Sequence, residues 1–367
     1  MRRDAIGSLA DAFAHRALIE PVFEEHTHRP LWSVMIPTFH CARFLRQTLE
    51  CVLAQDPGPE LMQIEVIDDC STQDDPESVV RAAAGERVHF FRQPKNVGHT
   101  RNFETCLRRA RGHLVHLLHG DDAVRHGFYR KMAQPFAENR QLGAAFCRSI
   151  TMDADDNWLY IAPLQQPQSG LLPDLVERLA VEQRIHTPAA VVRREVYETL
   201  GAFDRRLSWT EDWEMWARIA MHYPVWYEAE PLALYRIHDT SNSARYARTR
   251  ENLRDLKRLF EMVEGYVPNG RGKRLCREGK ERYARGGLDA ARRLLGRRDI
   301  AAAAGQMRGS LALCLNLRVL VQLAFLLAWA GWRACVHVMK GGLRHSRPLT
   351  GAQSGHDVHA IQLQSRK

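Results

Sequence analysis

The sequence predicts an α/β protein with a mostly parallel sheet flanked by helices, followed by a basic helical extension. Between residues 32 and 146, short apolar runs alternate with helical patterns, which is typical of βα units around a parallel sheet. Charge divides the chain, because residues 1–243 hold 27 Lys and Arg against 34 Asp and Glu, and residues 244–367 hold 25 against 9. With 45% hydrophobic and 26% charged residues, the composition excludes collagen-like, low-complexity and largely disordered proteins.

The first part of the predicted sheet alternates between strands and helices. Short apolar runs predict strands at 32–37, 64–68, 88–91 and 114–118. Apolar side chains at helical spacing, clearest where Leu45, Leu49 and Val52 fall on one side, predict the intervening helices. These helices are expected at 44–55, 75–84, 100–111 and from about residue 128. Each strand is thus followed by a helix, which favours parallel pairing.

The second part of the sheet is expected to be mixed. Two apolar runs separated by a turn-like segment predict a strand pair at 144–151 and 158–162. The elements expected next are a helix at 174–182, an extended segment at 186–192, a helix at 194–200 stopped by Gly201, and a strand at 225–234. A further helix begins after Thr210, the expected cap, and places Glu211 and Asp212 near the positive end of its dipole.

Polar clusters follow three of the predicted strands. They are Pro37-Thr38-Phe39-His40, Asp68-Asp69-Cys70-Ser71-Thr72 and Gly120-Asp121-Asp122. Ligands of open α/β sheets bind at the carboxyl ends of strands, so these clusters are expected to converge on one site. The sequence contains neither GxGxxG nor GxxxxGK[ST], which disfavours a dehydrogenase-type dinucleotide fold and a P-loop.

Each acidic pair has both a chemical and a structural interpretation. Asp121 and Asp122 suit a hard cation that bridges a diphosphate, or they form an ordinary turn. The Asp68-Asp69 segment offers acceptors for a base and a ribose, or it forms an Asx turn. Asp212 can serve as a general base beside a bound hydroxyl, or it belongs to a favourable acidic first turn.

Six segments, taken together, resemble the ordered motifs of family 2 inverting glycosyltransferases with the GT-A fold. They are WSVMIPTFHCARFLRQTLECVLAQ, IEVIDDCST, NVGHTRNFETCL, LVHLLHGDDAV, TEDWEMWARIA and LYRIHDTSNS, and they span residues 31–243. The resemblance implies a nucleotide-diphospho-sugar donor, with a UDP-sugar the first choice, and a divalent cation, Mn²⁺ or Mg²⁺. It also implies direct displacement at the anomeric carbon by an acceptor hydroxyl.

The resemblance assigns roles to particular residues. Its donor-binding set is Pro37, Thr38, Phe39, Asp68, Asp69, Asn96, Gly98, Arg101, Asn102 and Asp121. Its metal set is Asp121, Asp122 and His238, and its catalytic set is Asp212 as general base with Glu211 beside it. One departure concerns His119, which stands where many relatives have the first acid of Asp-x-Asp-Asp, and this puts metal affinity and metal choice in question.

The basic region predicts helices at a membrane surface. Residues 245–298 have the pattern of two Arg-rich amphipathic helices, and residues 310–332 form the most apolar stretch but include Asn316, Arg318 and Gln322. A polar stripe falls within one third of the helix circumference: Arg318, Gln322, Arg333, His337, Lys340, Arg344 and Arg347. This pattern favours an interfacial helix whose cations meet anionic lipid. The alternatives are a helix packed on the catalytic domain or on a partner subunit, and a true span.

These observations predict four regions: a helical lead at 1–30, a GT-A domain at 31–243, a basic helical region at 244–349 and a disordered tail at 350–367. The N-terminus lacks a signal-peptide pattern, and the eight scattered cysteines suggest reduced thiols. We therefore expect a cytoplasmic enzyme, peripheral on the inner membrane face, acting on a glycan or lipid-linked acceptor. The basic region lacks a nucleic-acid recognition motif, so no such partner is expected. The alternative function is a catalytically silent scaffold.

Overall fold

The chain divides into two compact units, residues 1–237 and 238–367. The computed structural model describes residues 14–22, 29–239, 241, 245–246 and 251–341. The predicted disordered tail at 350–367 lies outside the described residues. So do residues 1–13 and 23–28 of the predicted helical lead.

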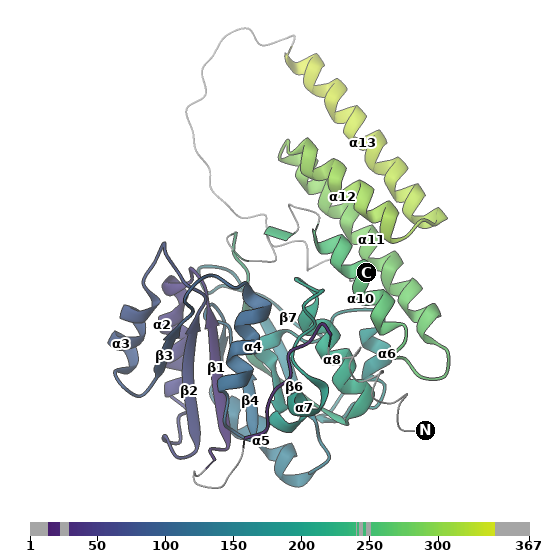
Figure 1. The fold of residues 1–367 in the computed structure, drawn as a ribbon. Coiled ribbons are helices and arrows are strands. Elements are labelled where there is room, and N and C mark those ends of the chain that lie inside the picture. Colours follow the sequence, from purple (N-terminus) through teal and green to yellow (C-terminus); the bar gives the residue numbers. More distant parts are fainter. Residues whose placement is uncertain (1–13, 23–28, 240, 242–244, 247–250, 342–367) are drawn as a thin grey trace. The chain divides into compact units, whose positions relative to one another are not determined.

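The first unit is built on a ten-stranded mixed sheet (Figure 1). Its central path runs β3-β2-β1-β4-β9-β6-β10-β5, with β7 paired to β6 and β8 to β10. The strands are β1 (Trp32–Thr38), β2 (Met62–Asp68), β3 (His89–Arg92), β4 (Leu114–Leu117), β5 (Ala123–Val124), β6 (Ala144–Met152), β7 (Trp158–Ile161), β8 (Gly170–Leu171), β9 (Ala190–Arg193) and β10 (Val225–Arg236). Strands β1 to β4 pair in parallel, β9 is antiparallel to β4 and β6, and β6 is parallel to β10. The predicted α/β class is confirmed.

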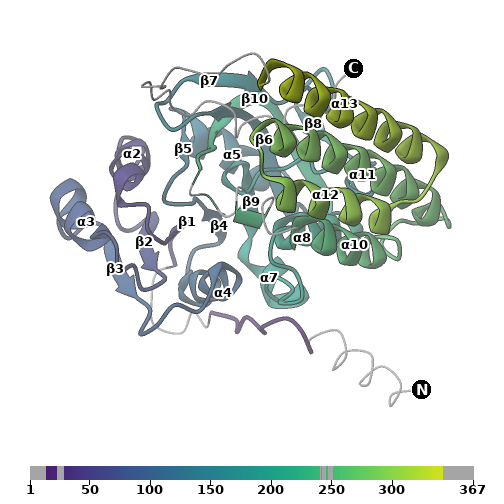
Figure 2. The ribbon, with the colours of Figure 1, turned by 90° about the horizontal axis from the view of Figure 1, so that it is seen from above.

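Helices cover both faces of this sheet. They are α2 (Ala42–Leu53), α3 (Pro76–Ala84), α4 (His99–Arg109), α5 (Phe128–Glu138), α6 (Leu175–Leu179), α7 (Arg194–Leu200) and α8 (Glu211–His222). Beside strands β1 to β3, helices α2 and α3 lie on one face and α4 on the other, as Figures 1 and 2 show together. Alternate residues of β1 (Trp32, Val34 and Ile36) join α2 and α5 in one buried apolar cluster.

Two expectations for this unit need correction. Residues 14–22 are not helical, because the backbone carbonyls of His15 and Ala17 accept hydrogen bonds from the amides of Arg205 and Ala202. The expected extended segment at 186–192 begins instead with a 3₁₀ turn, Thr187–Ala189, before β9. At residues 15–17, contacts with a distant segment override the local pattern, whereas Pro188 lies at the start of the 3₁₀ turn.

The second unit contains four helices among its described residues: α10 (Glu251–Val263), α11 (Gly272–Gly296), α12 (Ile300–Leu313) and α13 (Leu317–Gly341). Helix α10 buries the apolar side that its sequence predicts, which is Leu253, Leu256, Leu259, Phe260 and Val263. Helices α10, α12 and α13 all pack against α11. The two amphipathic helices expected over residues 245–298 correspond to α10 and α11.

The apolar stretch at 310–332 is not one helix. Its first residues end α12, and α13 begins at Leu317. The Asn316 side chain causes the break, because its Oδ1 accepts the Val319 amide at 3.0 Å and its Nδ2 donates to Glu281 at 2.8 Å. Within the part of the chain that the structure describes, no helix combines the length and apolar character needed to cross a membrane.

Candidate active site

The carboxyl ends of β1, β2 and β4 are joined by backbone hydrogen bonds. The Asp69 amide donates to the Thr38 carbonyl at 2.9 Å, and the Gly120 amide donates to the Pro37 carbonyl at 3.0 Å. Gly120 lies so close to β1 that a Cβ atom there would be 2.7 Å from Thr38 Oγ1. The predicted convergence of the three polar clusters is therefore present. Phe39, the next residue of the first cluster, is 44% exposed and available to a ligand.

Asp69 stabilises the loop that precedes α4. Its Oδ1 accepts the Val97 amide at 2.7 Å and its Oδ2 accepts the Gly98 amide at 3.0 Å. Gly98 has φ +83°, a conformation that favours glycine, and it is the N-cap of α4. Burial raises the pKa of Asp69, although the two amides oppose that rise. Asp69 and Gly98, two members of the predicted donor set, are thus adjacent.

Two other members of the predicted donor set are committed to internal hydrogen bonds. The buried Asp68 carboxylate accepts bonds from Ser71 Oγ at 2.5 Å and Arg92 Nε at 2.9 Å. Asn102 is 2% exposed, donates to the Ile67 carbonyl at 2.8 Å and accepts from Gln93 at 3.1 Å. These contacts assign Asp68 and Asn102 to holding the end of β2 in place.

The remaining two members of the set face solvent. Asn96 and Arg101 are exposed, and Arg101 lies in the first turn of α4. Among the described residues, Arg101 has no ion-pair partner. A cation at this end of α4 is suited to a diphosphate, since no carboxylate of the described residues pairs with it.

The turn after β4 is held from two sides. Thr48 Oγ1 of α2 donates to the carbonyls of Gly120 at 3.1 Å and Asp122 at 2.7 Å. Arg236, buried at the end of β10, donates its backbone amide to Asp122 Oδ1 at 2.8 Å and its Nε to the Asp121 carbonyl at 2.8 Å. The Asp121-Asp122 pair is therefore rigidly placed.

His119, Asp121 and Asp122 form a potential metal-binding group. One ligand atom from each lies within 4.8 Å of the others. His119 Nε2 and Asp122 Oδ2 are buried and have no hydrogen-bond partner, although His119 Nδ1 lies 3.5 Å from Asp122 Oδ2. Burial lowers the pKa of His119, which favours the neutral imidazole that ligates metals. The two unpartnered atoms and the mixed nitrogen and oxygen donor set fit a divalent transition cation.

Two acidic residues begin α8 near this group. Glu211 Oε1 lies 3.0 Å from His99 Nε2, and its buried Oε2 has no hydrogen-bond partner. His99 meets Phe103 edge to face, and Phe103 stacks on His119 with ring centroids 5.2 Å apart. This series of contacts through α4 connects the start of α8 to the end of β4.

The two carboxylates have opposite electrostatic environments. Burial opposes ionisation of Glu211, but the contact with His99 outweighs it and the pKa of Glu211 is lowered. Burial and the Glu211 charge raise the pKa of Asp212 to about 8. Asp212 Oδ2 accepts from Thr187 Oγ1 at 3.1 Å, and Oδ1 accepts from its neighbour's amide, Trp213 N, at 2.6 Å. A carboxylate with a pKa near neutrality is suited to accept a proton.

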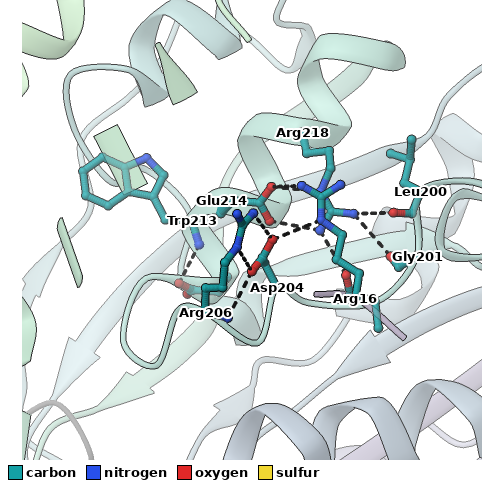
Figure 3. Close-up of polar contacts among 10 residues, drawn as sticks. Arg16, Leu200, Gly201, Asp204, Arg206, Trp213, Glu214 and Arg218 are labelled. Atoms are coloured by element: carbon teal, nitrogen blue, oxygen red, sulfur yellow. Dashed lines mark hydrogen bonds and ion pairs between the residues drawn. The ribbon is translucent and has the colours of Figure 1, made fainter. Parts of the chain in front are cut away.

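A buried ion-pair network anchors the N-terminal half of α8 (Figure 3). Glu214 Oε2 lies 3.0 Å from Arg218 NH2, and Glu214 Oε1 lies 3.3 Å from Arg16 NH2. Arg218 also donates to the Leu200 carbonyl at 2.5 Å, and Arg16 pairs with Asp204 at 3.3 Å. Because all these groups have partners, the network fixes the direction of α8 and with it the position of Asp212.

The structure brings together most of the predicted site within the first unit. His238 belongs to the second unit, so its role as a metal ligand stays a prediction. The sequence alone does not assign His119 to the metal group, and it indicates no role for His99 or Arg236. The only feature of the sequence that points to these three residues is their position within or near the recognised motifs.

Comparisons with known proteins agree with this fold. Residues 33–201 match the family model described as glycosyl transferase family 2. An uncharacterized protein of Mycobacterium tuberculosis is 27% identical over 254 residues, which cover 66% of this chain and 78% of that protein. An uncharacterized glycosyltransferase of Rickettsia typhi is 23% identical, and the aligned residues cover 60% of this chain and 69% of that protein.

Solved structures show the same fold. S. aureus TarS 1–349 in complex with UDP-GlcNAc matches with a TM-score of 0.56 at 14% identity. The match covers 68% of this chain and 71% of the TarS chain. The mannosyltransferase PcManGT from Pyrobaculum calidifontis, in complex with GDP-Man and Mn²⁺, matches with a TM-score of 0.52 at 20% identity. The match covers 89% of this chain and 91% of the PcManGT chain. The fold is of the GT-A type, and the match to the family model together with the named relatives identifies a glycosyltransferase. More particularly, residues 33–201 form a glycosyltransferase family 2 domain.

Proposed function

We propose that this glycosyltransferase transfers a sugar from a nucleotide-diphospho-sugar to an acceptor hydroxyl with inversion at the anomeric carbon. The observation that carries the proposal is the arrangement of two chemically different sites near one sheet edge. One is the group of His119, Asp121 and Asp122, in which His119 Nε2 and Asp122 Oδ2 are buried without a hydrogen-bond partner. The other is Asp212 at the start of α8, with its pKa raised toward neutrality.

The reaction requires a single displacement. The acceptor oxygen attacks the anomeric carbon, the bond from that carbon to the diphosphate oxygen breaks, and Asp212 takes the acceptor proton. Thr187 and the Trp213 amide hold the Asp212 carboxylate in place through its two oxygens. Glu211, ionised beside His99, stays available to orient the acceptor.

The donor is expected to lie along the ends of β1, β2 and β4. Phe39 is exposed at the end of β1, and Asp69 holds the loop before α4. Arg101 would meet the diphosphate. His119, Asp121 and Asp122 would hold a divalent cation, Mn²⁺ or Mg²⁺, which when bound supplies positive charge to the departing diphosphate. Complexes of similar folds with UDP-GlcNAc and with GDP-Man and Mn²⁺ support a donor of this class.

The acceptor is expected to be a glycan or a lipid-linked intermediate of a cell-surface polysaccharide, reached from the cytoplasmic face of the membrane. The basic helical unit supports this assignment, because residues 244–367 carry 25 Lys and Arg against 9 Asp and Glu. Such an excess suits the anionic headgroups of an inner leaflet.

A thermal-shift panel tests the donor and the cation together. Purified protein is heated with UDP-, GDP-, dTDP- and CMP-sugars, each with and without Mn²⁺ or Mg²⁺, and a ligand that binds only the folded state raises the unfolding midpoint. We expect a metal-dependent rise with one nucleotide class and a smaller response in Asp121→Ala. No rise with any donor would favour the alternative, a catalytically silent scaffold.

A further inference from the structure

Helix α13 is oriented opposite to the expectation from its sequence. The polar stripe was expected to face outward, but its first two members contact α11. Arg318 NH1 lies 3.1 Å from Glu281 Oε1. Gln322 Nε2 donates to Asp289 Oδ1 at 2.9 Å, and Gln322 Oε1 accepts from Arg285 Nε at 3.0 Å. Arg318 and Gln322 therefore attach the first turns of α13 to α11.

The side of α13 that is left outward is apolar. Its large members are exposed: Leu317 (76%), Leu320 (44%), Val321 (46%), Phe325 (72%), Leu327 (53%) and Trp332 (65%). At about 100° per residue they fall within an arc of about 160°. Val319 and Leu326, on the opposite side, are buried. Between Leu317 and Trp332, the other residues of that arc are Ala324, Ala328 and Gly331, so this part of the arc contains no charge. We call these six large side chains and the three small ones the outward face of α13.

The margin of this face carries aromatic and cationic groups. The guanidinium groups of Arg292 and Arg333 each lie 5.0 Å from the centroid of the Trp329 ring, and Trp332 is exposed on the face itself. Tryptophan beside arginine is the composition favoured where a hydrocarbon boundary meets lipid headgroups. The outward face extends for about 22 Å from Leu317 to Trp332, at 1.5 Å per residue.

Charge distinguishes between possible occupants of the face. Residues 251–341 contain 18 Lys and Arg against 8 Asp and Glu, a net charge of +10. Two copies of this unit would repel one another, whereas an anionic bilayer surface would attract it. A span is disfavoured, since no described helix is apolar enough to cross a membrane.

We infer that α13 lies in the plane of an anionic membrane surface, with its outward face inserted at the boundary between headgroups and acyl chains. The inference rests on the proposed placement of the enzyme at a membrane, but not on the transfer reaction. It names the binding surface and the orientation, with the arginines at the margin in contact with lipid phosphates.

The test compares two double variants of the full chain. Leu320→Glu with Phe325→Glu places two charges on the outward face. Leu61→Glu with Met221→Glu is the matched control, because those side chains are 45% and 47% exposed and lie in the first unit. Binding is measured by flotation with phosphatidylcholine vesicles, with and without phosphatidylglycerol. Circular dichroism and the unfolding midpoint establish that both variants fold.

We expect the wild-type chain and the control to bind phosphatidylglycerol vesicles, more weakly as salt rises. The affinity of the outward-face variant for these vesicles should be lower by about tenfold or more, because two large apolar side chains are no longer buried in the bilayer. Lipids brominated near the headgroup should quench the tryptophan fluorescence of the wild-type chain, and more weakly that of Trp332→Phe. The donor-dependent thermal shift should be equal in all three proteins, so its loss everywhere would count against the proposed function and not against this inference.

Three results would overturn the inference. Equal vesicle binding by both variants would show that the outward face is not the contact. A wild-type dimer in light scattering that Leu320→Glu with Phe325→Glu dissociates, without vesicle binding, would assign the face to a second copy. Strongest quenching by bromine at the bilayer centre would indicate insertion across the membrane.

Discussion

The end of β2 and the end of β4 lie at the same edge of the sheet, but their polar side chains are used differently. Near β2, Asp68 and Asn102 are buried with protein partners for their side-chain oxygens and for the Asn102 nitrogen. Near β4 and α8, single atoms of His119, Asp122 and Glu211 are buried without a hydrogen bond. An unpaired buried polar atom costs folding free energy, about 1–3 kcal/mol for a neutral group.

We propose that this difference separates residues that build the site from residues that bind a ligand. Polar atoms that already have partners gain little from a ligand, whereas unpartnered ones recover their lost interaction when it binds. The resemblance to a family assigns both the partnered and the unpartnered residues to the site. The hydrogen bonds divide them, and the following measurements test that division.

The largest effect is expected for Asp212→Asn. Removal of the base should lower the rate of transfer by about 10² or more, because general base catalysis contributes about 10²–10⁴. Donor binding should persist, and the unfolding midpoint should rise, because a neutral side chain avoids the burial and the Glu211 charge that raise the pKa of Asp212. Steady-state kinetics and thermal melts measure both effects. If donor affinity falls as much as the rate, Asp212 is not the base.

The pH profile gives the second effect. Asp212 must be ionised to accept a proton, and its pKa in the folded protein is about 8 against an ordinary 3.8. The value of kcat/KM for the donor, which reports the free enzyme, should therefore rise about tenfold per unit as pH increases toward 8 and then level off. A profile that is flat from pH 6 to 8 would contradict this assignment.

The third effect concerns His119→Ala. Loss of one ligand should weaken metal affinity by about 10- to 100-fold or more. Mutation of residues that only hydrogen-bond to a metal ligand already weakens metal affinity by this factor. His126→Ala is the matched control, since His126 is exposed and outside the metal group. Titration of Mn²⁺ by calorimetry measures the change. An unaltered affinity would place the cation elsewhere.

Arg101→Ala should have a smaller effect. Donor affinity should fall by about tenfold, or 1.4 kcal/mol, because one charge on the diphosphate loses its partner. The free energy of unfolding should change by less than about 0.5 kcal/mol, since Arg101 is exposed. Arg108→Ala, also exposed in α4, is the control, and both are compared by donor titration. Equal losses in the two variants would indicate a general charge effect.

The smallest effect on donor binding is expected for Asn102→Ala, although its effect on stability is large. Loss of the bond to the Ile67 carbonyl should lower the free energy of unfolding by about 1–3 kcal/mol. Asn96→Ala, on the exposed loop before α4, should leave stability within about 0.5 kcal/mol. Urea unfolding measures both. A loss of donor affinity in Asn102→Ala without a loss of stability would return Asn102 to the donor site.

Much of the fold and of the site could be predicted from the sequence alone. The period of apolar residues located β1 to β4 and α2 to α4, because that period is a local property of the chain. The polar clusters were expected to meet, since parallel strands place their carboxyl ends at one edge. The Asp121-Asp122 and Glu211-Asp212 pairs were identified in the same way, from their place at the end of a strand and the start of a helix.

Only the tertiary structure decided how these parts are used. It joined His119 to the metal group through the turn that Thr48 and Arg236 hold, and it placed His99 against Glu211. It also placed Arg318 and Gln322 of α13 against α11 and left an apolar side of this helix exposed. Periodicity shows that a helix has two faces, but which face is buried depends on the partners that distant segments supply, and no local pattern contains that information.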